Sequence, residues 1–475
     1  MARRQNTRRR TAPAAGQAPS QAAVDASPVS TWEPSTETKQ TSSPIFRVGE
    51  LWRGLHPGWR LAIILVVAQR IFLGLAGVLG YTLGPSQIIV GEHAQLVKPG
   101  GDWALWLSTW QRWDGLWYQF IAEQGYRTAE GSTAFYPLYP LLMKVVSVPL
   151  LGETAVAGLL VSTVAFGVAV KLLYDLVAFE MTQMTEAGVV QRGGRRPTTA
   201  SHGGRGAAGG STSVDPRQAA VITVLLLALY PSGFFLFAPY TESLFLALTV
   251  GCFLYARQGR WWIAGVLGFF AALTRAQGAL LVLVIGYEYL RQTGIFAWIM
   301  GNGGKKPTLS ALAVALPALG ALTWFAALRL WFGETQSGFA LLDRWGYRVV
   351  APWTALADSF IFVFGSGKHV LEFAPELLNL VTMLVFTGLA IVATRRLPLS
   401  YALYLWPSLL LLLTREMDHS PLMSVSRYSL VVFPCLMAAA LLVRTRPRVA
   451  VGILGVGAVA QFFYMMYYAG LGFVA

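Results

Sequence analysis

Long apolar stretches dominate this chain of 475 residues and constrain its fold more than any other feature. Only 13% of the residues are charged, whereas water-soluble proteins carry roughly a quarter. Runs long enough to cross a hydrocarbon layer of about 30 Å occur near 61–83, 154–179, 218–237, 239–257, 261–291, 309–332, 376–394, 399–414, 428–443 and 449–471. Because Arg275 divides 261–291 in two, the sequence predicts an all-α polytopic membrane protein with about eleven transmembrane helices.

The distribution of charge gives this chain an orientation. With the N-terminus on the cytoplasmic side, the inner segments contain 24 Lys and Arg against six acidic residues, and the outer segments contain nine against fourteen. Lys and Arg accumulate in cytoplasmic loops. The net charge of +14 is therefore interpreted mainly as an orientation signal, and a nucleic-acid-binding surface is disfavoured.

The same partition divides the chain into a tail and one membrane domain. Residues 1–55 are rich in Arg, Ser, Thr and Pro and are predicted to be a disordered, basic, cytoplasmic tail. No apolar core follows their arginines, so they are not interpreted as a signal peptide. Residues 56–475 are predicted to form the transmembrane domain, with a disordered cytoplasmic insertion at about 182–217 and outer loops at about 84–153 and 333–375. Any chemistry is expected to face outward.

A tryptophan stripe crosses the first outer loop. Its members recur at spacings of three and four, which predicts one face of a single interfacial helix: Trp103, Trp106, Trp110, Trp113, Trp117 and Phe120. Asp114 lies beside this stripe. A partly desolvated carboxylate at that place could act as a general base toward a hydroxyl at the membrane surface. The alternative is a solvated acid on the polar edge of the helix.

Three further charged residues lie at or near predicted helix ends. Arg275 interrupts an apolar stretch, and its expected partner is either a lipid phosphate or an acid such as Glu242. Glu242 opens a helix, where it could simply favour the helix dipole or serve as a second active-site acid. Arg427 begins another helix from the same side, where a cation opposes the dipole and an anion is the expected reason for its presence.

Metal sites and disulfides have little support in the sequence. The five histidines lack the spacing of zinc motifs, and only Glu416, Asp418 and His419 cluster on one loop, which is otherwise interpreted as a solvated turn. Cys252 and Cys435 lie inside apolar runs, so no disulfide framework is expected.

Two motifs and their order resemble a known family. Residues 112–118 read Arg-Trp-Asp-Gly-Leu-Trp-Tyr, and residues 135–140 read Phe-Tyr-Pro-Leu-Tyr-Pro, with two prolines that suit the first turn of a second short helix packed on the first. The likeness continues through 230–232, 238–243, 273–278 and 427–434. Together these segments resemble the PIG-V family of mannosyltransferases.

The resemblance implies a GT-C-type fold with interfacial helices in the first outer loop. It also implies an inverting, metal-independent glycosyltransferase that needs no cofactor and takes a polyprenyl-phosphate sugar, typically mannose, on the non-cytoplasmic face. Asp114 would be the general base, and Arg275 and Arg427 would bind the lipid phosphate. Trp113, Tyr126, Glu242 and Tyr139 would line the substrate pocket.

The basic tail and the 182–217 insertion depart from a compact member of that family. Their Ala, Gly and Arg bias indicates a bacterial multi-pass protein of the cell membrane, so a GPI anchor need not be the product and the acceptor, a glycolipid or glycan, stays open. A lipid-linked-sugar flippase or transporter and a non-catalytic membrane subunit are the alternatives.

Overall fold

The computed structural model describes residues 50–83, 105–128, 131–186, 215–303, 306–333, 346–365, 370–417 and 420–470. The chain divides into two units, Met1–Gly54 and Leu55–Ala475. In the first unit only residues 50–54 are described, and they are helical. Most of the predicted tail, and residues 187–214 of the predicted insertion, lie outside the described residues.

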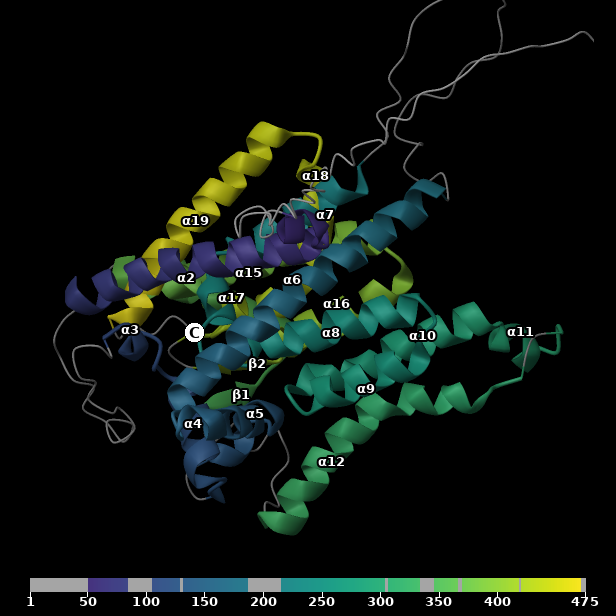
Figure 1. The fold of residues 1–475 in the computed structure, drawn as a ribbon, viewed down its shortest axis with the longest axis horizontal. Helices are drawn as coiled ribbons and strands as arrows, with labels where there is room; N and C mark the ends of the chain where they lie inside the picture. Colours follow the sequence, from purple (N-terminus) through teal and green to yellow (C-terminus); the bar gives the residue numbers. More distant parts are fainter. Residues whose placement is uncertain are drawn as a thin grey trace, which may run out of the picture. The chain divides into compact units, whose positions relative to one another are not determined.

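Two buried helices form the centre of the second unit. They are α6 (Thr154–Glu186) and α8 (Glu242–Arg257), which pack against each other along the middle of Figure 1. Helix α7 (Pro216–Ala228) packs on α6, and α18 (Phe433–Val443) packs on α7. The apolar residues of these helices belong to one continuous core, which includes Phe166, Phe237 and Phe253. The core thus consists of helices that are apolar on nearly every side, as expected for a chain that crosses a membrane.

A second pair joins the two ends of the described membrane domain. Helix α2 (Pro57–Leu83) lies beside α19 (Pro447–Ala469), drawn in purple and yellow in Figure 1. Gly80 permits their close approach, because a Cβ atom at that position would lie 2.1 Å from the carbonyl oxygen of Met466. Any side chain at Gly80 would therefore force the helices apart.

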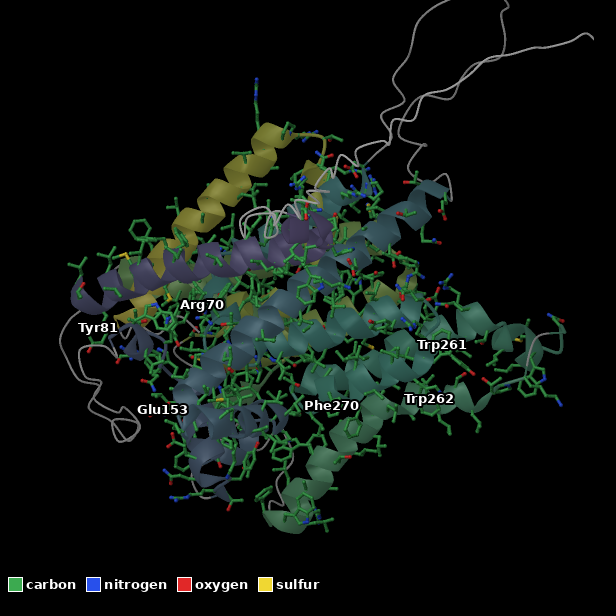
Figure 2. All side chains as sticks on the ribbon, viewed as in Figure 1. Arg70, Tyr81, Glu153, Trp261, Trp262 and Phe270 are labelled. Carbon is green, nitrogen blue, oxygen red and sulfur yellow. The ribbon has the colours of Figure 1, made fainter. Side chains whose placement is uncertain are left out.

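A third group of helices carries much exposed apolar surface. It comprises α9 (Trp261–Ala272), η8 (Ala276–Leu280), α10 (Leu281–Thr293), α11 (Ile295–Ile299), η9 (Leu309–Ala315) and α12 (Leu316–Trp331). On α9, Trp262 and Phe270 are 50% and 38% exposed (Figure 2). Large apolar side chains left in the open on several helices fit a lipid-facing surface rather than a water-facing one.

The region after residue 345 contains the one departure from an all-helical fold among the described residues. Two short strands, β1 (Tyr347–Val349) and β2 (Arg415–Met417), pair antiparallel with Arg348 opposite Glu416. Between them lie α14 (Pro352–Phe364), α15 (Val370–Arg396) and α16 (Leu399–Leu413). The described chain is otherwise helical, as predicted, and this short two-stranded pair is the exception. The second outer loop, predicted as 333–375, contains helix α14 and the start of α15.

The tryptophan stripe does not form a single helix, and that prediction is wrong. The described part consists of α3 (Leu105–Ser108), a turn, and α4 (Asp114–Gln124). The turn arises because Trp113 has a positive φ of 49°, outside helical geometry. The next short helix, α5 (Leu138–Ser147), begins at the prolines as predicted and packs on α4 through the rings of Tyr118 and Tyr139, 5.1 Å apart.

Several helices of the described chain can span a membrane. Five are long and apolar enough: Pro57–Leu83, Thr154–Glu186, Leu309–Trp331, Ala374–Arg396 and Pro447–Ala469. A sixth arises if Val425–Val431 and Phe433–Val443, bent by 80°, form one span. A largely helical chain with several candidate spans is thus confirmed, whereas the count of about eleven stays a prediction. The stretches at 218–237 and 261–291 are divided into shorter helices at Pro231 and Arg275.

Gly278 fixes the break between α9 and α10. A Cβ atom there would lie 2.3 Å from the backbone of Ala271 and Ala272, so Gly278→Ala is expected to displace η8 and destabilise the protein by about 1–3 kcal/mol. Unfolding in detergent at increasing SDS fraction measures this loss. Gly388→Ala is the matched control, because no atom lies within 4 Å of its Cβ position. Equal stability of the two variants would contradict the prediction.

Candidate active site

The turn before Asp114 is held by contacts from three other segments. The guanidinium of Arg112 donates to the carbonyl oxygens of Ser108 (2.6 Å) and Ala469 (3.2 Å). The carbonyl oxygen of Arg112 accepts a hydrogen bond from the hydroxyl of Tyr240 (3.0 Å). These bonds offset the strain of the positive φ at Trp113, about 1–3 kcal/mol for such a residue. Asp114 consequently begins α4 in a fixed direction.

Gly115 allows the start of α4 to lie directly on the segment before α8. A Cβ atom at Gly115 would lie 3.0 Å from Cγ of Pro239 and 3.5 Å from the ring of Tyr240. That close approach brings the Trp-Asp-Gly motif against the Pro-Tyr-Thr-Glu motif. Asp114 and Glu242 are thereby held on neighbouring helix N-termini, α4 and α8, where a carboxylate is favoured by the helix dipole.

Four of the predicted site residues form a single ion-pair cluster, called here the carboxylate–arginine cluster: Asp114, Glu242, Arg275 and Arg427. Nη2 of Arg427 donates to Oδ2 of Asp114 at 2.7 Å. Oε1 of Glu242 lies 2.9 Å from Nε of Arg427 and 3.1 Å from Nη1 of Arg275. The sequence left open whether Arg275 pairs with a ligand or with Glu242, and in this structure it pairs with Glu242.

The side chains of the cluster differ in exposure, and this difference decides which carboxylate a substrate hydroxyl can reach. The side chain of Glu242 is fully buried, and those of Arg275 and Arg427 are nearly so. The side chain of Asp114 is 30% exposed. Asp114 is therefore the carboxylate of the cluster that an incoming hydroxyl can reach, while Glu242 balances the charge of two buried guanidinium groups.

The position of Arg427 is set by a short helix and two polar contacts. Helix α17 (Val425–Tyr428) follows Ser424, which has a left-handed φ of 65°. The hydroxyl of Ser232 donates to the carbonyl oxygen of Ser426 at 2.9 Å, and the Ser426 amide donates to Oδ1 of Asn379 at 2.9 Å. The Tyr-Pro-Ser motif at 230–232 thus supports the Arg-Tyr motif at 427–428.

Aromatic rings surround the cationic side of the cluster. The ring of Tyr428 lies 4.7 Å from Cζ of Arg427 and 4.6 Å from Cζ of Arg275. Arg415, at the start of β2, is a third cation on the same ring, at 4.4 Å. The sequence reasoning did not propose Arg415 as a site residue. Its one sequence signal was its position directly after an apolar run on the predicted outer side.

The aromatic residues predicted to line the pocket occupy different places. Tyr139 is fully buried on α5, where its hydroxyl donates to the carbonyl oxygen of Gly158 (2.9 Å) and lies 2.7 Å from Oγ of Ser162. Ser162 in turn donates to the carbonyl oxygen of Tyr240 at 3.3 Å. Tyr139 therefore adjoins the cluster through Ser162 and Tyr240.

Trp113 directly precedes Asp114 and packs against the main core. Tyr126 lies beyond the end of α4, where its hydroxyl donates to the carbonyl oxygen of Phe135 at 3.1 Å. Its ring packs on Trp324 and Phe332, each at 5.1 Å. The structure therefore joins Tyr126 to α12, and among the described residues its hydrogen bond and ring contacts do not reach the carboxylate–arginine cluster.

Tyr118 on α4 is excluded as a base. Burial, and after it the charge of Asp114, raise the pKa of Tyr118, so its phenol stays protonated near neutral pH.

The loop considered as a metal site is only partly described. Glu416 is buried and binds Arg348 at 2.9 Å, and burial with the neighbouring Asp358 raises the pKa of Glu416. Asp418 and His419 lie outside the described residues. Across the parts of the chain that the structure describes, no group of three or more His, Cys, Asp or Glu is arranged to hold a metal ion, and Cys252 and Cys435 are buried free thiols.

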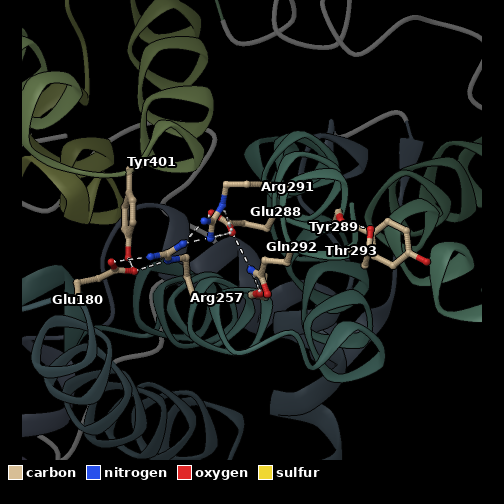
Figure 3. Close-up of polar contacts among 9 residues, drawn as sticks. Glu180, Arg257, Glu288, Tyr289, Arg291, Gln292, Thr293 and Tyr401 are labelled. Atoms are coloured by element: carbon tan, nitrogen blue, oxygen red, sulfur yellow. Dashed lines mark hydrogen bonds and ion pairs between the residues drawn. The ribbon is translucent and has the colours of Figure 1, made fainter. Parts of the chain in front are cut away.

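A second charged cluster, which the sequence reasoning missed, lies at the other end of α8 (Figure 3). Arg257 binds Glu180 of α6 through two nitrogens, at 2.5 and 3.0 Å, and Glu288 of α10 at 3.2 Å. Tyr401 of α16 donates to Glu180 at 2.9 Å, and Arg291 donates to Glu288 at 2.8 Å. This group, called the Arg257 cluster, ties together four helices.

The sequence comparisons bear on the family. No protein-family model matches the chain. A GPI alpha-1,6-mannosyltransferase 2 from Cricetulus griseus is 29% identical over 217 residues, 43% of this chain, and one from Rattus norvegicus is 29% identical over 240 residues, 50% of this chain. The chain is thus similar in sequence to the PIG-V mannosyltransferases, as its motifs predicted. The matches span only 38% and 40% of the length of these relatives.

Two solved structures of the oligosaccharyltransferase of Archaeoglobus fulgidus also match. One is a complex with zinc and sulfate, and the other holds an inhibitory peptide and a dolichol-phosphate. Both cover 86% of this chain, and 53% and 55% of their own, at 14% and 12% identity and a TM-score of 0.36. A TM-score of that size does not establish a common fold.

Proposed function

We propose that this chain is an inverting membrane glycosyltransferase of GT-C type. It transfers mannose from a polyprenyl-phosphate-mannose donor to a lipid-linked or glycan acceptor on the non-cytoplasmic face, and Asp114 is the general base. The observation that supports this most is the carboxylate–arginine cluster. In it the partly exposed carboxylate of Asp114, at the N-terminus of a predicted interfacial helix, lies 2.7 Å from the buried guanidinium of Arg427. Residues 56–475 form the catalytic domain, and no metal or cofactor takes part.

The proposed reaction is a single displacement. The acceptor hydroxyl oxygen attacks the anomeric carbon while its proton passes to Oδ2 of Asp114. The bond between that carbon and the phosphate oxygen breaks, and the electron pair leaves with the polyprenyl phosphate. Arg275 and Arg427 stabilise the charge that develops on the leaving phosphate. One base is sufficient, because inversion needs no covalent intermediate.

The ion pair between Asp114 and Arg427 implies an order for two steps of this reaction, donor binding and activation of the base. Oδ2 of Asp114 accepts a hydrogen bond from Nη2 of Arg427 at 2.7 Å, so this oxygen is occupied before the donor binds. A donor phosphate that engages Arg427 competes with Asp114 for the same nitrogen, Nη2, and so releases the carboxylate to accept a proton. Donor binding therefore precedes activation of the base.

The transporter alternative requires a charged path across the membrane. Helix α8 joins the carboxylate–arginine cluster to the Arg257 cluster, and its length is about 24 Å at 1.5 Å per residue. Between Glu242 and Arg257 it carries no charged residue, and the charged groups at each end are bound to one another. These observations favour a catalytic site at one end over a route between the two.

The donor class is tested with the full-length protein in liposomes. Labelled mannose is expected to pass from polyprenyl-phosphate-mannose to a glycolipid extracted from the membranes of the organism that makes this protein. In a strain that lacks the protein, mass spectrometry of the glycolipids should no longer detect the same product. Transfer from a nucleotide sugar instead, or an unchanged glycolipid profile in the deletion strain, would contradict the proposal. A non-catalytic subunit would give no transfer from either donor.

A further inference from the structure

The cations around Tyr428 are not equivalent. Arg275 and Arg427 both bind Glu242, and Arg427 also binds Asp114. Arg415 contacts the faces of two rings, Tyr428 at 4.4 Å and Tyr347 at 5.2 Å, and within the described ranges no carboxylate forms an ion pair with it. Its side chain is partly exposed. Counting the ion pairs of the described residues, Arg415 is thus the one of the three arginines that an incoming anion can reach without breaking such a pair.

We propose that Arg415 is the first contact for the phosphate of the lipid-linked donor and holds it against Tyr428, beside the carboxylate–arginine cluster. This inference rests on the proposed function, because it names a residue for the phosphate of that same donor. A guanidinium stacked on aromatic rings has a fixed plane and presents its N–H groups at its edge, which suits a phosphate oxygen.

The carboxylate–arginine cluster and Arg415 together match the charge of the donor. Three arginines and two carboxylates leave one positive charge, which equals the single negative charge of a phosphodiester donor. After transfer the leaving phosphate monoester approaches a charge of minus two, while Asp114 has taken up a proton and leaves the site with two positive charges. Without Arg415 both states would have one uncompensated negative charge in a nearly buried place, which is costly.

The test measures binding rather than turnover. The full-length protein, in nanodiscs of phosphatidylcholine, is titrated with polyprenyl phosphate, with the uncharged polyprenol, and with inorganic phosphate. Arg415→Gln is expected to raise the Kd for polyprenyl phosphate at least about tenfold, since a hydrogen bond to a charged group contributes about 1.5–3 kcal/mol. The Kd for polyprenol should not change, and Arg415→Lys should recover part of the loss.

Arg260→Gln is the matched control. Arg260 also lies over a tyrosine ring, that of Tyr255 at 5.3 Å, but belongs to the opposite end of α8. An unchanged Kd in Arg415→Gln, an equal loss of polyprenol binding, or inorganic phosphate bound as tightly as polyprenyl phosphate would each overturn the inference. If the wild-type protein itself fails to bind polyprenyl phosphate, the proposed donor is wrong as well, so the two failures are distinguishable.

Discussion

Asp114→Asn is expected to lower the rate of sugar transfer by about 100- to 10,000-fold, the usual contribution of a general base. The amide has nearly the same shape and can still accept the hydrogen bond from Arg427, but it cannot take the proton of the acceptor hydroxyl. The measurement is single-turnover transfer from polyprenyl-phosphate-mannose in liposomes. The Kd for polyprenyl phosphate should stay the same or fall, because the neutral amide competes less strongly than the carboxylate for Nη2 of Arg427.

Asp175→Asn is the control for this variant. Asp175 is also an aspartate in an ion pair, with Lys171 at 2.6 Å, and its side chain is 21% exposed against 30% for Asp114. Asp175 lies in the C-terminal half of α6, whereas Ser162, which contacts Tyr240, lies in the N-terminal half. Transfer should therefore be unaffected. Wild-type turnover in Asp114→Asn would return Asp114 to the simpler interpretation, a solvated acid on the edge of an interfacial helix.

Arg257→Met is expected to destabilise the protein by about 3–5 kcal/mol, because it leaves the carboxylates of Glu180 and Glu288 buried without their shared cation. Their side chains are 1% and 0% exposed, and that of Arg257 is 8% exposed. The loss is measured from unfolding in mixed detergent micelles. Transfer activity per folded molecule should not change, since the length of α8 separates Arg257 from Glu242 of the carboxylate–arginine cluster.

Arg291→Met provides the comparison within the same cluster. Arg291 also pairs with Glu288, at 2.8 Å, but its side chain is 46% exposed. Exposed ion pairs contribute at most about 1 kcal/mol, so this variant should be nearly as stable as wild type. Equal stability of Arg257→Met and Arg291→Met would show that burial does not set the strength of these pairs.

Much of the candidate site was accessible from the sequence. The interruption of an apolar stretch identified Arg275, and the order of the Trp-Asp and Pro-Leu-Tyr-Pro motifs identified Asp114. The starts of α8 at Glu242 and of α5 after Pro137 were also predicted, because Pro and acidic residues have strong positional preferences at helix N-termini.

The turn at Trp113 was not accessible in the same way. Spacings of three and four predicted a continuous helix, yet the chain turns there because Arg112 bonds to Ala469 and accepts from Tyr240. Residue spacing reports local preference, and contacts with distant segments can override it. The contacts of Arg415 with Tyr428 and of the Arg257 cluster were missed for the same reason.

The sequence by itself determined which segments are apolar, which segments carry the positive charge, and which residues belong to the motifs, because hydropathy, charge and spacing are properties of neighbouring residues. Only the tertiary structure decided which of those residues meet. Asp114 and Arg427 lie 313 positions apart in the sequence and are joined by a hydrogen bond of 2.7 Å. Such a contact depends on how α4, α8 and α17 pack. That packing is decided by contacts throughout the core, which no local sequence pattern contains.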